Sequence, residues 1–342
     1  MDLQIIWFFL WALLWAVFFM TDGFDFGIGA LLPILGKTDN DKRLMINAMG
    51  PFWDGNQVWL IAAGGVTFAA FPLLYATMFS ALYAALMLIL FALILRGVAM
   101  EFRGKSEDKI WRRCWDLCIF GGSVAPAVLF GVAFANFFQG LPIDGEGIHH
   151  GGLFSLLNGY GLLGGVLFLV LFIQHGALWL TIRTEGELQK RAEALAGGFF
   201  WAALATTLIF LIFTRFETRL FENFHAKPIL FLLPLVTLAA FAQVKIFLMK
   251  RRFFVAWFSS ALVIVSCVFF GFVGLFPTLL LSSIDPAFSL TAFNASSSPL
   301  TLSIMLGVVL VFVPIILIYQ TWAYTLFRGK VTAEDLALED AY

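Results

Sequence analysis

Residues 51–59 read PFWDGNQVW, and they begin a long apolar segment that continues to residue 71. This stretch gathers one carboxylate, two amides and two indoles, from Asp54, Asn56, Gln57, Trp53 and Trp59. A charged side chain at the edge of a hydrocarbon layer is costly unless it is paired, hydrated or protonated. The stretch therefore predicts a membrane-spanning helix with a functional carboxyl group at its start.

The composition of the whole chain is that of a polytopic membrane protein. Hydrophobic residues make up 61% of the sequence, charged residues make up 13%, and the mean hydropathy is +0.93. Apolar runs of about 20 residues, long enough to cross a bilayer, recur along the chain. The net charge of −1, with no separate basic patch, argues against a nucleic-acid partner. The three cysteines lack the further ligands that a metal site needs.

We expect an all-α integral membrane fold with nine transmembrane helices. The expected spans are 5–35, 53–71, 76–98, 117–139, 160–182, 197–216, 228–247, 254–281 and 300–327. The first span exceeds what a bilayer requires, so we expect it to be tilted or locally broken at Gly23, Gly27, Gly29 and Pro33. The connections 140–159 and 282–299 are expected to be loops. The span order predicts one four-span unit in 1–155, a second in 156–285, and a ninth span with a tail in 286–342.

Lysine and arginine residues are distributed unevenly between the two sides of this topology. Eighteen of them fall on one side and three, Arg215, Arg219 and Lys227, fall on the other. Because positive residues accumulate on the cytoplasmic side, we expect the amino terminus outside and the carboxyl terminus in the cytoplasm. This orientation requires an odd number of spans.

Two acids lie within the first expected span. At about 100° per residue, Asp22, Asp25 and Gly29 occupy one sector of about 60° on a helix. The two acids could simply hydrogen-bond neighbouring helices and stabilise the fold. We favour a buried proton path, because two acids on one face are costly in a membrane and a small residue beside them admits close neighbours.

The opening stretch places Trp53, Asp54, Asn56 and Gln57 over a helical arc of about 160°, which predicts one polar face near the cytoplasmic entrance. Asp54 lies in the first turn, where the helix dipole favours a carboxylate. An N-terminal cap with interfacial tryptophans is the alternative interpretation. We favour proton entry at Asp54, with Trp53 and Gln57 able to line a headgroup pocket.

Arg96, near the inner end of the third span, could pair with Glu101 or with an acid on another helix, but we favour an arginine that snorkels to the interface. His175 is the one histidine inside a span, and it lacks a good second ligand for haem, so we interpret it as a satisfied polar residue. No nucleophile motif, P-loop or dinucleotide fingerprint is found, and no catalytic or metal-binding residue is assigned.

Four runs of the sequence resemble subunit II of the cytochrome bd-type quinol oxidases. They are TDGFDFG at 21–27, FWDGNQVWL at 52–60, GVAF at 131–134 and VPII at 313–316. The resemblance implies part of a bacterial cytoplasmic-membrane oxidase that oxidises quinol and reduces dioxygen to water. It implies a fold of two four-helix bundles plus a peripheral ninth helix.

The resemblance also implies partners and cofactors. Haem b558, haem b595 and haem d are expected in subunit I, the heterodimer partner that this chain scaffolds, and none is expected in this chain. Some family members hold a quinone in subunit II, and small accessory subunits are allowed. The sequence leaves open whether the donor is ubiquinol or menaquinol.

Individual residues match the family pattern. Asp54 falls on the acid of a proton route from the cytoplasm toward haem d, and Asp22 and Asp25 fall on the acids of the first helix. Trp53 and Gln57 fall beside a quinone position. Asn56, Arg96 and Glu101 are supporting polar residues. The connection 217–227 is shorter than in some relatives, and His175 replaces a residue that is not ionisable in some of them. A stand-alone proton-coupled transporter remains the alternative function.

Overall fold

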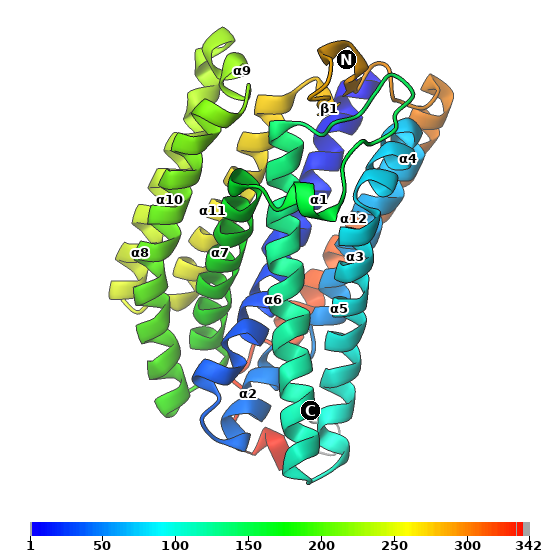
Figure 1. The fold of residues 1–342 in the computed structure, drawn as a ribbon. Helices are drawn as coiled ribbons and strands as arrows, with labels where there is room; N and C mark the ends of the chain where they lie inside the picture. Colours follow the sequence, from blue (N-terminus) through cyan, green and yellow to red (C-terminus); the bar gives the residue numbers. More distant parts are fainter. Residues whose placement is uncertain (1, 333, 338–342) are drawn as a thin grey trace.

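The structure, a computed structural model, describes residues 2–332 and 334–337 and is helical almost throughout (Figure 1). The first half comprises α1 (Leu3–Leu35), α2 (Asp39–Met49), α3 (Trp53–Ala70), α4 (Pro72–Ala81), α5 (Tyr83–Phe102) and α6 (Lys109–Gln139). The second half comprises α7 (Gly159–Arg183), α8 (Gly186–Glu217), α9 (Phe221–Ala226), α10 (Leu232–Met249), α11 (Phe253–Leu275) and α12 (Pro299–Leu326).

Short elements connect the long helices. They are the 3-10 helices η1 (Arg103–Lys105), η2 (Leu153–Leu156), η3 (Pro228–Phe231), η4 (Pro286–Phe288) and η5 (Asp335–Ala337), and the strands β1 (Thr278–Leu280) and β2 (Leu290–Thr291). The two strands pair antiparallel, with Thr278 opposite Thr291 and Leu280 opposite Leu290. The connections 140–159 and 282–299 contain no long helix, so the prediction of loops there is confirmed.

Eight helices of the described chain are long and apolar enough to cross a membrane. They are α1, α5 with η1, α6, α7, α8, η3 with α10, α11 and α12. The helix α3, which was expected as the second span, is not among them, since its first turns carry Asp54, Asn56 and Gln57. The eight long apolar helices of the described residues confirm the predicted all-α membrane class.

Several predicted boundaries are wrong. Of the two alternatives for the first span, tilted or locally broken, the break is ruled out, because α1 runs unbroken through Gly23, Gly27 and Gly29, with Pro33 inside its last turn. The helices α6 and α8 begin earlier than expected, at Lys109 and Gly186. The span expected to reach residue 281 ends at Leu275, since Pro277 cannot continue a helix and β1 follows. The expected third span begins at Pro72 as α4 and changes to α5 after Leu82.

The helix α1 is the centre of the packing. It contacts α3, α6, α7 and α11, and most of its residues from Trp15 to Leu35 are buried. A Cβ on Gly27 would lie 1.8 Å from the carbonyl oxygen of Phe172, and one on Gly176 would lie 2.6 Å from the backbone nitrogen of Ile28. Glycine is therefore required where the backbones of α1 and α7 touch, a close approach typical of membrane helices.

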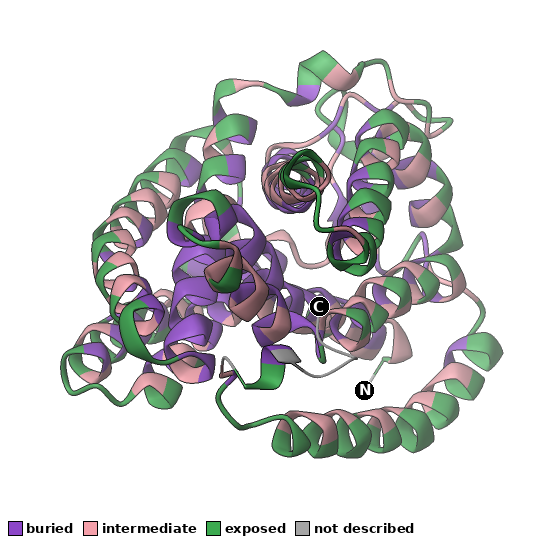
Figure 2. Cartoon of the chain, turned by 90° about the horizontal axis from the view of Figure 1, so that it is seen from below, coloured by how far each residue is buried: buried purple, intermediate pink, exposed green. Residues whose placement is uncertain are grey.

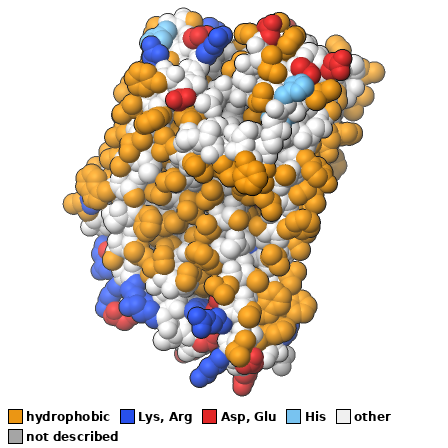
Figure 3. Space-filling model, in the orientation of Figure 1, with side chains coloured by type: hydrophobic (Ala, Val, Ile, Leu, Met, Phe, Trp, Pro, Cys, Tyr) orange, Lys and Arg blue, Asp and Glu red, His pale blue; other side chains and the backbone are white. Residues whose placement is uncertain are grey.

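Charged and hydrophobic side chains occupy different parts of the surface. Hydrophobic side chains cover the middle of the molecule, and charged ones gather at its two ends (Figure 3). Buried residues concentrate in the inner helices, while the outer helices carry exposed residues (Figure 2). We call the end that carries α2 and the α5–α6 connection the α2 end, and the opposite one the β1 end (Figure 1).

The helices α3 and α12 lie antiparallel from one end of the molecule to the other. At the β1 end, Ser297 donates from its backbone nitrogen to the carbonyl oxygen of Ala70 over 2.8 Å. At the α2 end, Gln320 Nε2 donates to the carbonyl oxygen of Gly55 over 2.9 Å. Between these attachments α12 is mostly exposed on this chain, which leaves it at the periphery.

Candidate functional site

An ion pair is buried between α1 and α5. Arg96 Nη2 lies 2.7 Å from Asp22 Oδ1 and 3.1 Å from Asp22 Oδ2, and neither side chain is exposed to solvent. The guanidinium carbon also lies 4.3 Å from the centre of the Phe26 ring. The interpretation of Arg96 as a snorkelling residue is therefore wrong, and its partner is an acid on another helix, not Glu101. Helical spacing on α5 alone could not reveal that Arg96 faces α1.

Asp25 lies beside this pair and bonds to a neutral amide. Asn56 Nδ2 donates to Asp25 Oδ2 over 2.7 Å and to the carbonyl oxygen of Thr21 over 3.3 Å. Asp25 is 1% exposed, and Asn56 is fully buried. Charge interactions connect Asp22, Asp25 and Arg96. The structure thus brings together both predicted acids of the first span, Asn56 and Arg96.

The helix α12 supplies a residue that sequence reasoning missed. Tyr324 Oη donates to Asn56 Oδ1 over 2.8 Å, and its ring packs against Phe52 with 4.5 Å between centroids. One turn earlier, Gln320 Oε1 accepts from Trp59 Nε1 over 3.0 Å. The signal in the sequence was the presence of Gln320 and Tyr324 near the end of a mostly apolar span. These contacts connect five side chains, which we call the buried polar chain: Tyr324, Asn56, Asp25, Asp22 and Arg96.

Some polar atoms in and beside the buried polar chain have no protein partner. Asp25 Oδ1, Arg96 Nε, Arg96 Nη1 and Gln57 Nε2 are buried and have no hydrogen-bond partner among the described residues. Buried polar groups in proteins are almost always hydrogen-bonded, to protein atoms or to ordered water. These four atoms are therefore positions where water or a ligand would bind.

The polar residues at the start of α3 do not form one face. Asn56 points to α1 and is buried, whereas Asp54 is exposed on the surface of this chain. Trp53 is half-buried, and its ring packs over Gly97 of α5, the residue after Arg96. A Cβ added to Gly97 would lie only 3.3 Å from this ring. Gln57 follows Trp53 by one turn on the same side. Glu101 is exposed near the end of α5. The prediction that Asp54 shares a face with Asn56 is therefore wrong.

His175 belongs to a separate contact between α1, α7 and α11. Its Nδ1 lies 2.5 Å from Ser260 Oγ, its Nε2 lies 3.0 Å from the carbonyl oxygen of Met20, and its ring stacks on Trp257. A carbonyl oxygen only accepts, so Nε2 carries the proton. Both ring nitrogens therefore have protein partners. The interpretation of His175 as a satisfied polar residue is confirmed.

Comparison with known proteins identifies the family. The sequence model described as "Cytochrome bd terminal oxidase subunit II" matches residues 3–327. The Bacillus subtilis protein "Cytochrome bd ubiquinol oxidase subunit 2" is 36% identical over 334 residues, with 98% of each chain covered. The Escherichia coli K12 protein "Cytochrome bd-I ubiquinol oxidase subunit 2" is 37% identical over an alignment of 370 residues. This alignment, gaps included, covers 98% of this chain and 96% of the relative. This chain belongs to the cytochrome bd terminal oxidase subunit II family.

A solved structure shares the fold of this subunit II family member. The bd oxidase from Geobacillus thermodenitrificans aligns with a TM-score of 0.77 over 95% of this chain and 99% of that chain, at 14% sequence identity. At such low identity the likeness concerns the fold alone.

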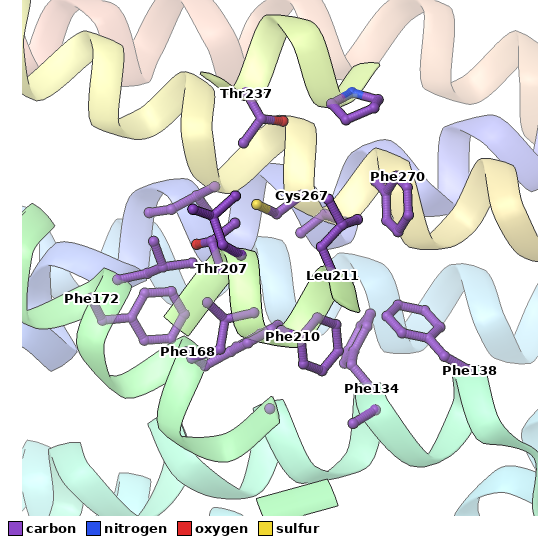
Figure 4. Close-up of a pocket in the computed structure, with 18 of the residues that line it drawn as sticks. Phe134, Phe138, Phe168, Phe172, Thr207, Phe210, Leu211, Thr237, Cys267 and Phe270 are labelled. Atoms are coloured by element: carbon purple, nitrogen blue, oxygen red, sulfur yellow. The ribbon is translucent and has the colours of Figure 1, made fainter. Parts of the chain in front are cut away.

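The subunit II chain also contains an apolar cavity of about 80 Å³, away from the buried polar chain. It lies between α6, α7, α8, α10 and α11, and phenylalanine rings form much of its wall (Figure 4). Thr207, Thr237 and Cys267 contribute its few polar atoms. Neither Trp53 nor Gln57 lines this cavity, so it is distinct from the predicted headgroup pocket.

Proposed function

We propose that this chain is the non-haem subunit II of a quinol:oxygen oxidoreductase in a bacterial respiratory chain. In this proposal it forms a heterodimer with a haem-bearing subunit I, which it scaffolds, and small accessory subunits are allowed. Subunit I holds haem b558, haem b595 and haem d, and the complex oxidises quinol and reduces dioxygen to water. Family membership over residues 3–327 carries this proposal. The relatives named above are oxidase subunits, so we do not retain the stand-alone transporter.

The buried polar chain is proposed as part of a proton path. Arg96 is bonded directly to Asp22, whereas Asp25 bonds to the neutral amide of Asn56 and to Asp22, and has no cation in direct contact. Asp25 is therefore the carboxyl group of the two that can take up and release a proton. The unpartnered Asp25 Oδ1 and the two unpartnered guanidinium nitrogens of Arg96 support this role, because they offer bonding positions to water along the path.

Asp54 is proposed as the proton entry. It lies in the first turn of α3 at the α2 end, where eighteen of the Lys and Arg residues were predicted to lie. Its exposure on this chain makes it reachable from the solvent or from a neighbouring subunit. Protons taken up here would have to pass α3 to reach Asp25 on α1.

Trp53 and Gln57 are proposed to contact a quinone. Gln57 Nε2 is a buried donor without a partner among the described residues, and a quinone carbonyl is an acceptor. The half-buried indole of Trp53 lies one turn away and offers an aromatic face. These two features support a headgroup position between α3 and α5.

Nine crossings are proposed, with α3 as the second. The helix α3 is hydrogen-bonded to Ser297, just before α12, and to Gln320, near the end of α12. It therefore runs alongside most of a helix that is long enough to cross the membrane. The helices α1 and α12 begin at the same end, since Gln4 Nε2 donates to Ser296 Oγ over 3.0 Å, and α12 ends at the other. A chain that begins at one end and finishes at the other crosses an odd number of times, which supports nine. We keep the division into two four-helix bundles, 1–155 and 156–285, and a peripheral helix with its tail, 286–342.

The oxidase proposal is tested by purification from native membranes. We expect the chain to extract together with a haem protein that shows haem b and haem d absorbance, while the isolated polypeptide shows none. A stoichiometric haem signal from the isolated chain, or its purification without a haem protein, would refute the proposal.

The proton path is tested by Asp25→Asn and Asp54→Asn in the purified complex. We expect each to lower quinol-dependent oxygen consumption by about a hundredfold, the lower end of the range lost when a proton-transfer group is removed. The haem d absorbance should stay unchanged. Glu222→Gln, an exposed acid at the β1 end, is the control and should keep full turnover. If Asp25→Asn slows turnover and Asp54→Asn does not, protons enter elsewhere.

A further inference from the structure

A charged recess of about 400 Å³ opens at the α2 end, between the start of α2 and the first turns of α6. Its volume is that of many small-ligand sites. Thr38 and eight charged side chains line it: Lys37, Lys42, Lys109, Arg112, Arg113, Asp39, Glu107 and Asp116. None of them belongs to the buried polar chain or to the predicted headgroup pocket.

Two of the three acids in the recess are already compensated. Asp39 accepts from Arg103 over 2.7 Å and from Arg112 over 2.8 Å. Asp116 accepts from Arg103 over 2.6 Å and from Lys42 over 2.7 Å. Each of these carboxylates therefore faces two cations, and the network fixes the shape of the recess without removing its positive charge.

Three cations remain for a ligand. Lys37, Lys109 and Arg113 are exposed and form no ion pair with any carboxylate of the described chain. Lysine and arginine converging on one concave surface favour an anion, and phosphate oxygens accept from both side chains. The single remaining acid, Glu107, cannot balance all three. This set of side chains favours a phosphate-bearing anion.

The surroundings of the recess favour a lipid over a free anion. Ile34, in the last turn of α1, is 52% exposed, and Leu117, one turn beyond Arg113 on α6, is 61% exposed. Each of these apolar side chains thus lies close in sequence to a cation of the recess, Lys37 or Arg113, on the side of the membrane-spanning part of its helix. Basic pockets between membrane helices recognise anionic headgroups in this way. We propose that the recess binds the phosphate group of an anionic phospholipid, whose acyl chains lie along Ile34 and Leu117.

The test is native mass spectrometry of the intact complex after delipidation and reloading with phosphatidylglycerol or phosphatidylcholine. We expect the wild-type complex to retain phosphatidylglycerol in preference to phosphatidylcholine. Lys37→Ala combined with Arg113→Ala should lower this retention roughly tenfold, since each cation near an anionic headgroup contributes several-fold to affinity. The matched control is Lys250→Ala combined with Arg252→Ala, which removes two exposed cations outside the recess and should retain the lipid.

A charge-preserving pair, Lys37→Arg with Arg113→Lys, checks that the effect is one of charge and not of folding. We expect it to retain phosphatidylglycerol as the wild type does. Equal retention by all variants would overturn the site. If an excess of inorganic phosphate displaces the lipid and alone stabilises the wild type but not the alanine pair, the ligand is a soluble phosphate, and the lipid assignment is overturned.

Discussion

At the scale of single residues, Arg96 decides how two acids can be kept inside a membrane protein. It is fully buried, bonds to Asp22 and lies over the ring of Phe26. A carboxylate left without its cation at this depth carries an uncompensated charge in a medium that solvates it poorly. Asp22 therefore depends on α5 for its stability.

Arg96→Gln should destabilise the protein strongly, by about 3 kcal/mol, because it leaves Asp22 buried and unpaired. Thermal unfolding of the purified complex, followed by tryptophan fluorescence, measures this. The double variant Asp22→Asn with Arg96→Gln should recover much of the lost melting temperature, since both charges are then absent. Asp22→Asn is measured alone as well. If the melting-temperature changes of Arg96→Gln and Asp22→Asn simply add in the double variant, the two residues are not coupled, and the ion pair does not have this role.

At the scale of elements, α2 is fastened to the rest of the fold by ion pairs. Arg191 of α8 donates from Nη2 to Asp41 Oδ1 over 2.8 Å and from Nη1 to the carbonyl oxygen of Leu35 over 2.7 Å. Burial raises the pKa of the Asp41 carboxyl, but the hydrogen bonds of Arg191 and Thr38 lower it by more, so its pKa lies below the ordinary value. The charged form of Asp41 thus stabilises the docking of α2.

The contribution of Asp41 should depend on pH in one direction. A lowered folded-state pKa stabilises the protein fully above the unfolded value of about 3.9, and this stabilisation is lost as pH falls through the folded value. We expect the melting temperature of the wild type to fall more steeply below about pH 4 than that of Asp41→Asn. The two curves are compared by scanning fluorimetry between neutral and acidic pH. Parallel curves would contradict the assignment.

The glycine contact between α1 and α7 should tolerate no side chain. Gly27→Ala would place its Cβ against the backbone of Phe172, so we expect loss of folded protein in a size-exclusion assay. Gly198→Ala on α8 is the matched control, because a Cβ there meets nothing within 4 Å. In a helix this control should be neutral or slightly stabilising. Normal yields of Gly27→Ala would show that α1 and α7 can separate without cost.

The sequence predicts the elements better than their ends or their neighbours. Hydropathy marks only the part of a helix that lies in hydrocarbon, so the charged first turns of α6 and α8 were assigned to connections. Periodicity shows which residues share a face of one helix, and it placed Asp22 and Asp25 together. It contains no information on the helix opposite, so it could not pair Arg96 with Asp22 or bring Tyr324 to Asn56. Those contacts depend on how the helices pack.

At the scale of the whole molecule, charge differs between the two ends. Eighteen Lys and Arg residues were assigned to one side, and the α2 end carries the ion-pair networks of Asp39, Asp41 and Asp116. The β1 end carries the loop with Asp144 and Glu146 and the short helix α9. By the positive-inside rule we propose that the α2 end faces the cytoplasm.

Impermeant thiol labelling of intact cells tests this orientation. In a background with Cys114, Cys118 and Cys267 replaced by Ser, we expect Glu146→Cys to be labelled from outside. Lys250→Cys should react only after the membrane is permeabilised. The reverse pattern would place the amino terminus in the cytoplasm and remove Asp54 as a cytoplasmic proton entry.

The single carboxamide of Asn56 joins a peripheral helix to a buried acid. Its oxygen accepts from Tyr324 of α12, and its nitrogen donates to Asp25 of α1. An amide is rigid, so a displacement of the end of α12 must either break the bond from Tyr324 or turn the amide away from Asp25. We therefore expect a mechanical load on α12, from lipid or from a neighbouring subunit, to reach the buried carboxyl group of Asp25 through this one amide.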